Sequence, residues 1–539
     1  MSKRQVYLLS PKELSPETIA VAFAKTSRSP ESFREIAAEL NEESSAKFHE
    51  RWVVGYGHAS VAEHAVLHIA IENVSRLAVE CIESNRLASY TEKSTRYQKW
   101  DADSFIIPSE LDDHPLRDTF IRTCKLLFGA YAQSLSPVRA TVEGQNPRRE
   151  NESDEAYNRR IRSQYVDSCR FLLPAASLAN LGMTVNARVL EHAISKMLSH
   201  PLAEVREIGE EVKGAALAEI PTLVKYATPL PYLTEISAAF YHIAHGENKE
   251  KNKKNSVVKP EWCQLIDFDP DGETKVLAAA LYRFGEMPYT RALETVRSAP
   301  ESERDRLAES LLGHLGEHDT PLRELEYTTY TFDLILDQGG YAEFKRHRMM
   351  TQTPQRLTTR LGVALPRQIV EAGFEVPYRS AMETAAEAYE KLADWNPHVA
   401  SYVVPNGFNR RVLFTMHEVH NVHNAAYKRP SRSGASTPCW QNTCACRKKP
   451  GRRSKRKTCK ETELSHRRGD GSSYKLPAAD SMFIPIKAQI PRTMRALKTR
   501  PRMPNTFFAF LWATAAIPSP SPTRATRAEA QVSAESTPA

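Results

Sequence analysis

The most constraining feature of this 539-residue chain is a weak internal repeat. In the first half, Ser60–His64 precedes an apolar run and a helix-like stretch that ends in the polar segment Ser84–Tyr97. In the second half, Pro321–Glu326 precedes an apolar run, a Gly-Gly break and a helix-like stretch that ends in Arg346–Arg360. Both halves therefore predict a helix, a strand, a helix and a polar loop in the same order.

A second pair of similar segments, each with an apolar run and a proline, continues the repeat. Apolar runs end in Pro174 and Pro405, and twelve residues later the halves have Asn186 and His417. Between the two pairs of segments the halves differ by about 31 residues, and the charged stretch 143–160 accounts for this as an inserted surface loop at little entropic cost. A duplicated α+β domain explains the arrangement more simply than two unrelated domains do.

Amino-acid composition indicates the boundaries between the two repeats, the linker and the C-terminal tail. The Lys- and Asn-rich stretch 245–260 has little to bury and predicts a linker between repeat 1 (1–244) and repeat 2 (261–425). The remaining segment, 426–539, is a basic, low-complexity tail with 23 Lys/Arg against 6 Asp/Glu. Because the whole chain has a net charge of +8, the body that precedes this tail is mildly acidic, which gives no electrostatic reason to expect a nucleic-acid enzyme.

The chain shows neither a membrane span nor a secretion signal. No apolar run reaches the roughly 18 residues that a membrane helix needs. The first residues turn polar at once and lack the apolar core of a signal peptide. We therefore expect a cytoplasmic protein with no membrane partner.

The tail contains a cysteine cluster and a basic run. The cysteines, with His466 nearby, lack the paired CxxC spacing of zinc sites, so we expect no metal. They are Cys439, Cys444, Cys446 and Cys459. The basic run 447–460 favours a solvated, disordered segment over a nucleic-acid site. Since the composition changes abruptly where a helix is expected, a frameshift is an alternative origin for the tail.

Three groups of polar side chains are candidates for ligand binding. Arg346, His347 and Arg348 follow a predicted helix, where they either cap its C-terminus or reach a bound phosphate or flavin ring. The second group provides the hydroxyl and guanidinium donors that hold a phosphate monoester, and comprises Ser89, Ser94 and Arg96. The third group lies beside an apolar run or at a helix start, where Arg170 needs a partner, and also includes Asn186 and Arg188.

Taken together, the segments GHASVAEH, SNRLASYTEKSTRY, RFLLP and VNARVLEH resemble the flavin-dependent thymidylate synthases. The signature of that family is Arg-His-Arg, two residues, Ser, four residues, Ser, one residue and Arg. In repeat 1, Ser84-Asn85-Arg86 stands at the Arg-His-Arg position, while the two serines and the last arginine are present. In repeat 2, Arg-His-Arg is intact, but Thr351, Arg356 and Thr358 replace the rest. Each half thus keeps what the other has lost.

The resemblance implies an α+β subunit around an antiparallel sheet, assembled as four subunits, hence as a dimer of duplicated chains. It implies conversion of deoxyuridylate (dUMP) to thymidylate with FAD as cofactor and with methylenetetrahydrofolate and NADPH as co-substrates. Each active site is shared between subunits, so one composite site between the repeats is expected. No cysteine nucleophile is needed, and Cys81 is interpreted as a small core residue.

The resemblance also assigns residues to this composite site. Catalytic positions that contact flavin are Arg346, His347 and Arg348. Further flavin positions are His64, Arg86, Asn186, Arg188 and His192, the last replacing an asparagine. Nucleotide positions are Ser89, Ser94, Arg96 and Arg170.

Several departures from the family pattern keep a second hypothesis open. Lys196-Met197 stands where a leucine-arginine pair is expected, Glu326 is the repeat 2 counterpart of His64, and Ser401 that of Arg170. A site without an arginine clamp loses charge-assisted binding. The alternative is therefore a catalytically inactive nucleotide- or flavin-binding subunit with a structural or regulatory role.

Overall fold

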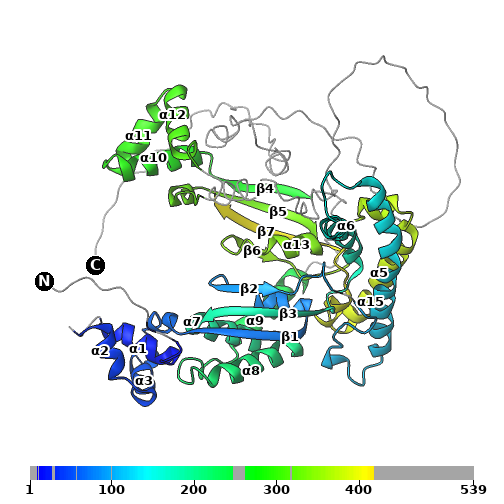
Figure 1. Ribbon diagram of the computed structural model, residues 1–539, viewed down its shortest axis with the longest axis horizontal. Helices are drawn as coiled ribbons and strands as arrows, with labels where there is room; N and C mark the ends of the chain where they lie inside the picture. Colours follow the sequence, from blue (N-terminus) through cyan, green and yellow to red (C-terminus); the bar gives the residue numbers. More distant parts are fainter. Residues whose placement is uncertain are drawn as a thin grey trace, which may run out of the picture.

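Two antiparallel sheets, one from each repeat, form the centre of the protein (Figure 1). The computed structural model describes residues 9, 11–26, 29, 31–55, 58–98, 100–246, 262–315 and 319–417. The predicted tail, 426–539, and nearly all of the predicted linker lie outside these residues. Sheet 1 has the order β1-β3-β2, with strands β1 (Val66–Ser75), β2 (Ala88–Glu92) and β3 (Leu178–Asn186). Sheet 2 has the order β4-β5-β7-β6, with strands β4 (Cys263–Phe268), β5 (Thr329–Asp337), β6 (Thr351–Pro354) and β7 (Asn409–His417).

Strand register confirms the duplication. In sheet 1, Ser75 at the end of β1 pairs with Leu178 at the start of β3. In sheet 2, Asp337 and Asn409 form the corresponding pair between β5 and β7. Strands β1 and β5 each run directly into a helix, so the same strand-to-helix junction occurs twice. The expected duplicated α+β fold, with antiparallel sheets and helices, is therefore confirmed.

The two junctions use the same local chemistry. The Ser75 hydroxyl accepts a hydrogen bond of 2.9 Å from the Ala78 backbone N–H and caps α4 (Arg76–Ile82). The Asp337 carboxylate accepts one of 2.6 Å from the Gly340 N–H and caps α13 (Gln338–Phe344). Ser and Asp are preferred at this position because their side-chain oxygens satisfy N–H groups that the first helical turn leaves unpaired.

The repeats meet about a pseudo-twofold axis. Pro174 and Pro405, which are equivalent in the repeat, face each other in an antiparallel bridge. Their neighbours exchange reciprocal backbone hydrogen bonds, from Ala175 N to Val404 O and from Asn406 N to Leu173 O, each 3.0 Å long. A twofold axis produces this pattern, in which the same hydrogen bond occurs twice between equivalent positions. A site that uses one part of each repeat consequently has a pseudo-equivalent on the other side of the axis.

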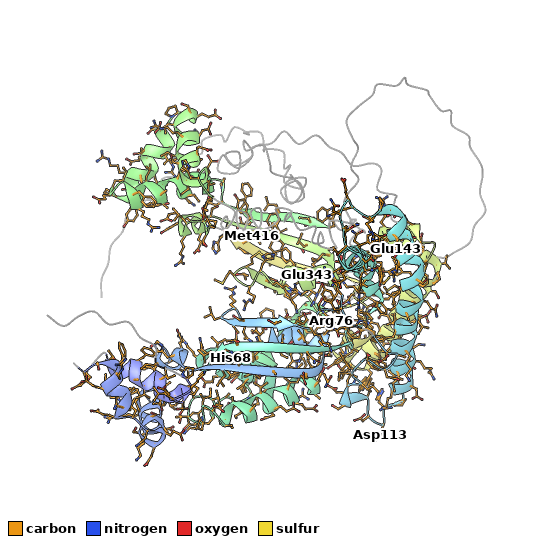
Figure 2. The ribbon with its side chains drawn as sticks, viewed as in Figure 1. His68, Arg76, Asp113, Glu143, Glu343 and Met416 are labelled. Atoms are coloured by element: carbon orange, nitrogen blue, oxygen red, sulfur yellow. The ribbon has the colours of Figure 1, made fainter. Side chains whose placement is uncertain are left out.

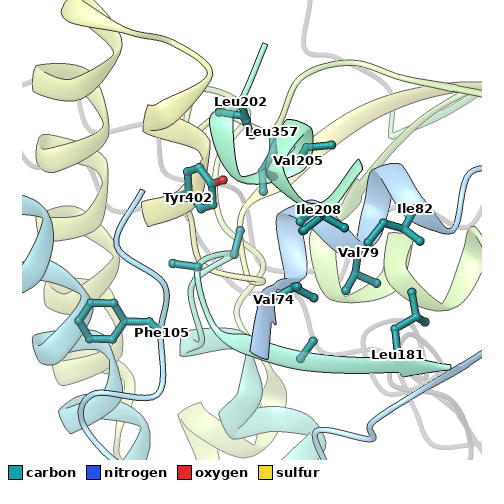
Figure 3. Packing of buried hydrophobic residues seen from close by; sticks show 14 of the residues in the cluster. Val74, Val79, Ile82, Phe105, Leu181, Leu202, Val205, Ile208, Leu357 and Tyr402 are labelled. Carbon is teal, nitrogen blue, oxygen red and sulfur yellow. The ribbon is translucent and has the colours of Figure 1, made fainter. Parts of the chain in front are cut away.

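One hydrophobic core extends through both repeats. It includes Leu357 and Tyr402 of repeat 2 together with Val74, Leu181 and many other residues of repeat 1 (Figure 3). Two long helices, α5 (Arg117–Gln145) and α15 (Glu375–Trp395), pack against each other at one end of both sheets (Figure 1). Because apolar side chains of both repeats are removed from water together, the repeats stabilise each other.

The remaining helices surround this centre. In repeat 1 they are α1 (Pro16–Thr26), α2 (Phe33–Ala38), α3 (Glu42–His49), α6 (Asp154–Cys169), α7 (Ala187–Leu198), α8 (Ala203–Leu217) and α9 (Pro231–Gly246). In repeat 2 they are α10 (Gly272–Phe284), α11 (Tyr289–Ser298), α12 (Glu301–Leu312) and α14 (Arg367–Glu371). Single turns are η1 (Glu50–Gly55), η2 (Val61–His64), η3 (Ser109–Leu111), η4 (Arg170–Leu172), η5 (Arg323–Tyr327) and η6 (Val399–Val403). Within the described ranges, no helix combines the length and apolar character needed to cross a bilayer.

The structure corrects two local predictions. The stretch 143–160 is a surface loop only over residues 146–153, because α5 continues to Gln145 and α6 begins at Asp154. Ser153 caps α6, and Ile161 on its inner face is buried, so the charges of residues 154–160 lie on a solvated helix face. The segment after Ser84 is not only a polar loop, since Ser89 lies on strand β2.

Candidate functional site at the repeat interface

A chain of alternating charges joins repeat 1 to repeat 2. Arg96 donates from Nε and Nη2 to the two carboxylate oxygens of Asp167, at 2.7 and 3.1 Å. Arg170 Nη2 lies 3.2 Å from Asp167 and 3.9 Å from Glu343. Glu343 in turn lies 3.0 Å from Arg346 Nη1. The structure thus brings together Arg96, Arg170 and Arg346, three of the predicted site residues, and we call these five residues the interface chain.

Secondary structure places each member of the interface chain. Arg96 follows strand β2, Asp167 occupies the last turn of α6, and Arg170 begins the adjoining turn η4. Glu343 is in the last turn of α13, and Arg346 follows that helix. Figure 2 shows Glu343 beside sheet 2, on the side that faces sheet 1. The site is therefore built from helix and strand ends of both repeats, as the composite-site hypothesis requires.

Burial distinguishes the inner members of the interface chain from the outer ones. Asp167 is 3% exposed and Arg170 is 8% exposed, whereas the Arg346 side chain is 60% exposed. A buried charge requires a partner of opposite sign. The expectation that Arg170 needs a partner is met by Asp167, which was not among the predicted site residues. Its spacing of three residues before Arg170, at the end of a helix, was the available signal.

A buried carboxyl near Arg170 predicts a pH effect on stability. Burial raises the pKa of Asp337 from 3.8 to about 6, although backbone N–H groups and Arg170 act in the opposite direction. Since the folded state holds this proton more tightly, its contribution to stability is complete below 3.8 and is lost as the pH rises through about 6.

We expect Asp337→Ser, which copies the cap Ser75 of repeat 1, to gain stability relative to the wild type over this pH window. The expected gain at neutral pH is about 1–3 kcal/mol, because each pKa unit corresponds to about 1.4 kcal/mol. Urea unfolding of both proteins at a series of pH values measures the difference. Asp337→Asn, a neutral residue that can also cap, is the matched control and should behave like the serine variant. Parallel wild-type and variant curves would contradict the prediction.

A cavity of about 520 Å³ lies between α4 and the end of α7 in repeat 1 and β6 and η6 in repeat 2. Six cationic residues line it: Arg86, Lys196, Lys345, Arg348, Arg356 and Arg410. Its two carboxylates are each paired, Glu80 with Arg410 and Glu83 with Lys345, both at 2.7 Å. In the described part of the chain, the other four cations have no carboxylate within ion-pair distance. The cavity is therefore a positively charged site.

Two predicted flavin residues, Arg86 and Arg348, lie in this cavity. Arg86 Nη2 donates to the Thr351 hydroxyl at 3.0 Å, and the Arg348 guanidinium lies 5.4 Å from the centroid of the Tyr90 ring. Arg348 Nη1 is buried and has no hydrogen-bond partner among the described residues. An unsatisfied buried N–H is costly, and a ligand oxygen would satisfy it.

The other predicted flavin residues gather at one end of sheet 1. Asn186 caps α7 by accepting a hydrogen bond from the Val189 N–H. Arg188 forms an ion pair with Glu63, which holds η2 against the start of α7. Two imidazoles complete the group, with His64 and His192 both exposed. Within the described ranges, no hydrogen bond or ion pair joins this group to Arg346 or Arg348, so the structure does not bring the two predicted flavin groups into contact.

The remaining predicted residues have local roles. Ser89 is exposed on β2, opposite Thr184. Ser94 is also exposed, and its hydroxyl accepts a hydrogen bond of 3.3 Å from the Arg96 N–H. The His347 ring packs 6.2 Å from that of Phe344, measured between centroids. Ser94 therefore contacts the Arg96 backbone, whereas Ser89 is placed on the neighbouring strand β2.

Comparison with known proteins identifies relatives for both repeats. The sequence model described as "Thymidylate synthase complementing protein" matches residues 9–222 and 264–433, one segment in each repeat. A "UPF0159 protein" of Chlamydia muridarum is 34% identical over 400 residues, which cover 70% of this chain and 73% of the relative. A "Flavin-dependent thymidylate synthase" of Clostridium tetani is 29% identical over 217 residues, which cover 40% of this chain and 83% of the relative. The structure of thymidylate synthase X from Helicobacter pylori with FAD and dUMP covers 40% of this chain and 95% of that one, at 15% identity and a TM-score of 0.28.

Proposed function

The chain belongs to the thymidylate synthase complementing protein family, and on this basis we propose that it methylates dUMP to thymidylate. The proposed cofactor is FAD, and the proposed co-substrates are methylenetetrahydrofolate and NADPH. The observation that carries the proposal is the interface chain, which connects Arg96 of repeat 1 to Arg346 of repeat 2 through Asp167, Arg170 and Glu343. The signature halves that the two repeats have kept thus meet at one interface.

We assign the nucleotide to the repeat 1 side of this interface. Guanidinium groups bind phosphate through charge-assisted hydrogen bonds, and serine hydroxyls add neutral donors. The proposed phosphate ligands are Ser89, Ser94, Arg96 and Arg170. A phosphate must compete with Asp167 for the N–H groups of Arg96. Arg170 Nε and Nη2 are buried without a hydrogen-bond partner among the described residues, although Nη2 lies 3.2 Å from Asp167.

We assign flavin to the residues that the family resemblance selects. The donor chemistry fits, because FAD carries a diphosphate and ring carbonyls, and the buried Arg348 Nη1 provides an N–H without a partner in the described structure. The proposed ligands are His64, Arg86, Asn186, Arg188, His192, Arg346, His347 and Arg348. When bound, flavin supplies the hydride chemistry. The protein's arginines orient the ligands and stabilise negative charge that develops on the uracil ring.

Separate substitutions test the division between the repeats. We expect Arg96→Ala to weaken dUMP binding at least tenfold and Arg346→Ala to weaken FAD binding similarly, since a hydrogen bond to a charged group contributes about 1.5–3 kcal/mol. Fluorescence titration with FAD and calorimetric titration with dUMP give the two affinities. Arg291→Ala, on the exposed surface of α11, is the matched control and should change neither. If both site variants affect the same single ligand, the division is wrong.

The inactive-subunit hypothesis has its own support. Asp167 already neutralises both Arg96 and Arg170, which is the arrangement of a structural ion-pair network. Activity separates the two hypotheses. The purified protein should be yellow, and with methylenetetrahydrofolate and NADPH it should release the uracil C5 proton of dUMP. Flavin or nucleotide binding without proton release would favour the inactive subunit.

We further propose a cytoplasmic dimer of duplicated chains. Two chains with two repeats each provide the four subunit equivalents that the family resemblance implies. Light scattering of the purified chain measures the assembly directly.

A further inference from the structure

On the other side of the pseudo-twofold axis, the positions equivalent to those of the interface chain carry different side chains. Counted from the caps Ser75 and Asp337, Glu343 corresponds to Cys81 and Arg346 corresponds to Ser84. Counted from Pro174 and Pro405, Arg170 corresponds to Ser401. Cys81, Ser84 and Ser401 all line the 520 Å³ cavity, so the cavity occupies the pseudo-equivalent position and has lost the charges of the interface chain.

Different cations have replaced those charges. Lys196, at the end of α7, donates from Nζ to Asn85 Oδ1 at 2.8 Å and to the Ser84 hydroxyl. Arg356, from the other repeat, has a buried Nε with no hydrogen-bond partner among the described residues, and its guanidinium lies 5.5 Å from the Tyr241 ring centroid. Neither cation is paired with a carboxylate in the described part of the chain. Burial lowers the pKa of Lys196.

The walls of the cavity indicate the class of ligand. Its volume of about 520 Å³ falls within the roughly 300–1,000 Å³ typical of small-molecule sites. Apolar side chains face the same space as the cations: Leu77, Leu202, Met350, Pro354 and Leu357. A ligand that satisfies both surfaces has a strongly anionic group and a flat or apolar body.

We propose that Lys196 and Arg356 form a second anion site, which binds the phosphate of a nucleotide-sized phosphate monoester. The site is separate from the interface chain and lies on the opposite side of the pseudo-twofold axis. It does not depend on turnover at the interface chain, because its two cations belong to neither proposed set of substrate or flavin ligands. Arg86 and Arg348, two proposed flavin ligands, line the same cavity. A chain with this site binds one nucleotide in addition to any that the interface chain holds.

The test uses dUMP as the probe and the FAD-loaded full-length chain. Calorimetric titration should show two equivalents of dUMP bound per chain, one of which is lost or weakened at least tenfold in Lys196→Met/Arg356→Met. Arg96→Ala should affect the other equivalent. Lys391→Met/Arg291→Met removes two exposed charges elsewhere and should leave both equivalents intact. Lys196→Arg, which keeps the charge, should retain binding at the second site.

A readout from within the cavity separates this proposal from the proposed function. His200 and His398 line the cavity, and an anion bound there should shift their NMR signals and raise their pKa values, which burial now lowers. Inorganic phosphate and dUMP should both produce the shift, and deoxyuridine should not. If the histidine signals respond to neither anion, or respond equally in Lys196→Met/Arg356→Met, the second site does not exist.

Three other outcomes also overturn the proposal. A response to inorganic phosphate without one to dUMP would exclude a nucleotide-sized ligand. Loss of FAD in place of dUMP from Lys196→Met/Arg356→Met would assign these two cations themselves to the flavin site. Loss of C5 proton release with unchanged dUMP stoichiometry would place these cations in the catalytic site. By contrast, an anion response in a chain that shows no turnover supports the second site and contradicts only the proposed function.

Discussion

Asp167→Ala is expected to lower the free energy of unfolding by about 3–5 kcal/mol, the usual cost of removing one partner of a buried ion pair. Asp167 is 3% exposed and neutralises Arg96 and Arg170, and Arg170 is itself 8% exposed. Its removal leaves Arg170 with only Glu343, at 3.9 Å, as a carboxylate within ion-pair distance in the described structure. Because Arg170 lies beside the bridge that joins the repeats, both repeats should unfold together at lower denaturant concentration. Urea unfolding followed by circular dichroism measures the loss.

A matched control separates burial from simple charge removal. Asp103 forms an ion pair of 2.8 Å with Lys125, but its side chain is 75% exposed. Exposed pairs of this kind contribute about 0–1 kcal/mol, so Asp103→Ala should be nearly neutral. Equal effects of the two substitutions would show that burial of Asp167 does not govern its contribution.

Glu80→Ala is expected to lower the free energy of unfolding by a similar amount, again about 3–5 kcal/mol, because it removes the carboxylate partner of a buried arginine. Arg410 on β7 is 4% exposed, and its Nη1 donates to both carboxylate oxygens of Glu80, at 2.9 and 2.7 Å. This pair connects α4 of repeat 1 to sheet 2 of repeat 2. Without it, Arg410 keeps only the Gln338 and Gln355 oxygens as acceptors in the described structure.

Lowering the pH should reproduce part of this loss of stability in the wild-type protein. Burial alone would raise the pKa of Glu80, but Arg410 and Lys345 outweigh it and hold the pKa below its ordinary value of 4.5. The stabilisation is therefore complete above 4.5 and is lost as the pH falls through the lowered pKa. Glu80→Ala should remove that part of the acid sensitivity. Glu143→Ala, which breaks an exposed pair with Arg139, should preserve it and serves as the control.

Local sequence patterns predicted the order of elements well. The apolar runs depend on neighbours close in sequence, so β1, α4, β5 and α13 could be recognised in both halves. The failures have a common cause. Charged residues on the outer face of α6 obscured its buried side, where Ile161 packs, and the hydroxyls of β2 resemble those of a loop.

The candidate site was only partly predictable. The need of Arg170 for a partner follows from an arginine beside an apolar run, but nothing local identified Asp167 or Glu343 as that partner. Lys196 and Arg356 appeared in the sequence only as departures from a family signature. Their role as walls of one cavity requires the two repeats to be packed together.

The sequence by itself determined that an α+β unit occurs twice and which half of a binding signature each copy retains, because periodicity, capping and spacing are properties of neighbouring residues. Only the tertiary structure decided which halves meet. The pseudo-twofold contact at Pro174 and Pro405 joins the segment that precedes β3 to the segment that precedes β7. Charges far apart in the chain thereby become mutual neighbours, and the free energy of burying them depends on that packing alone.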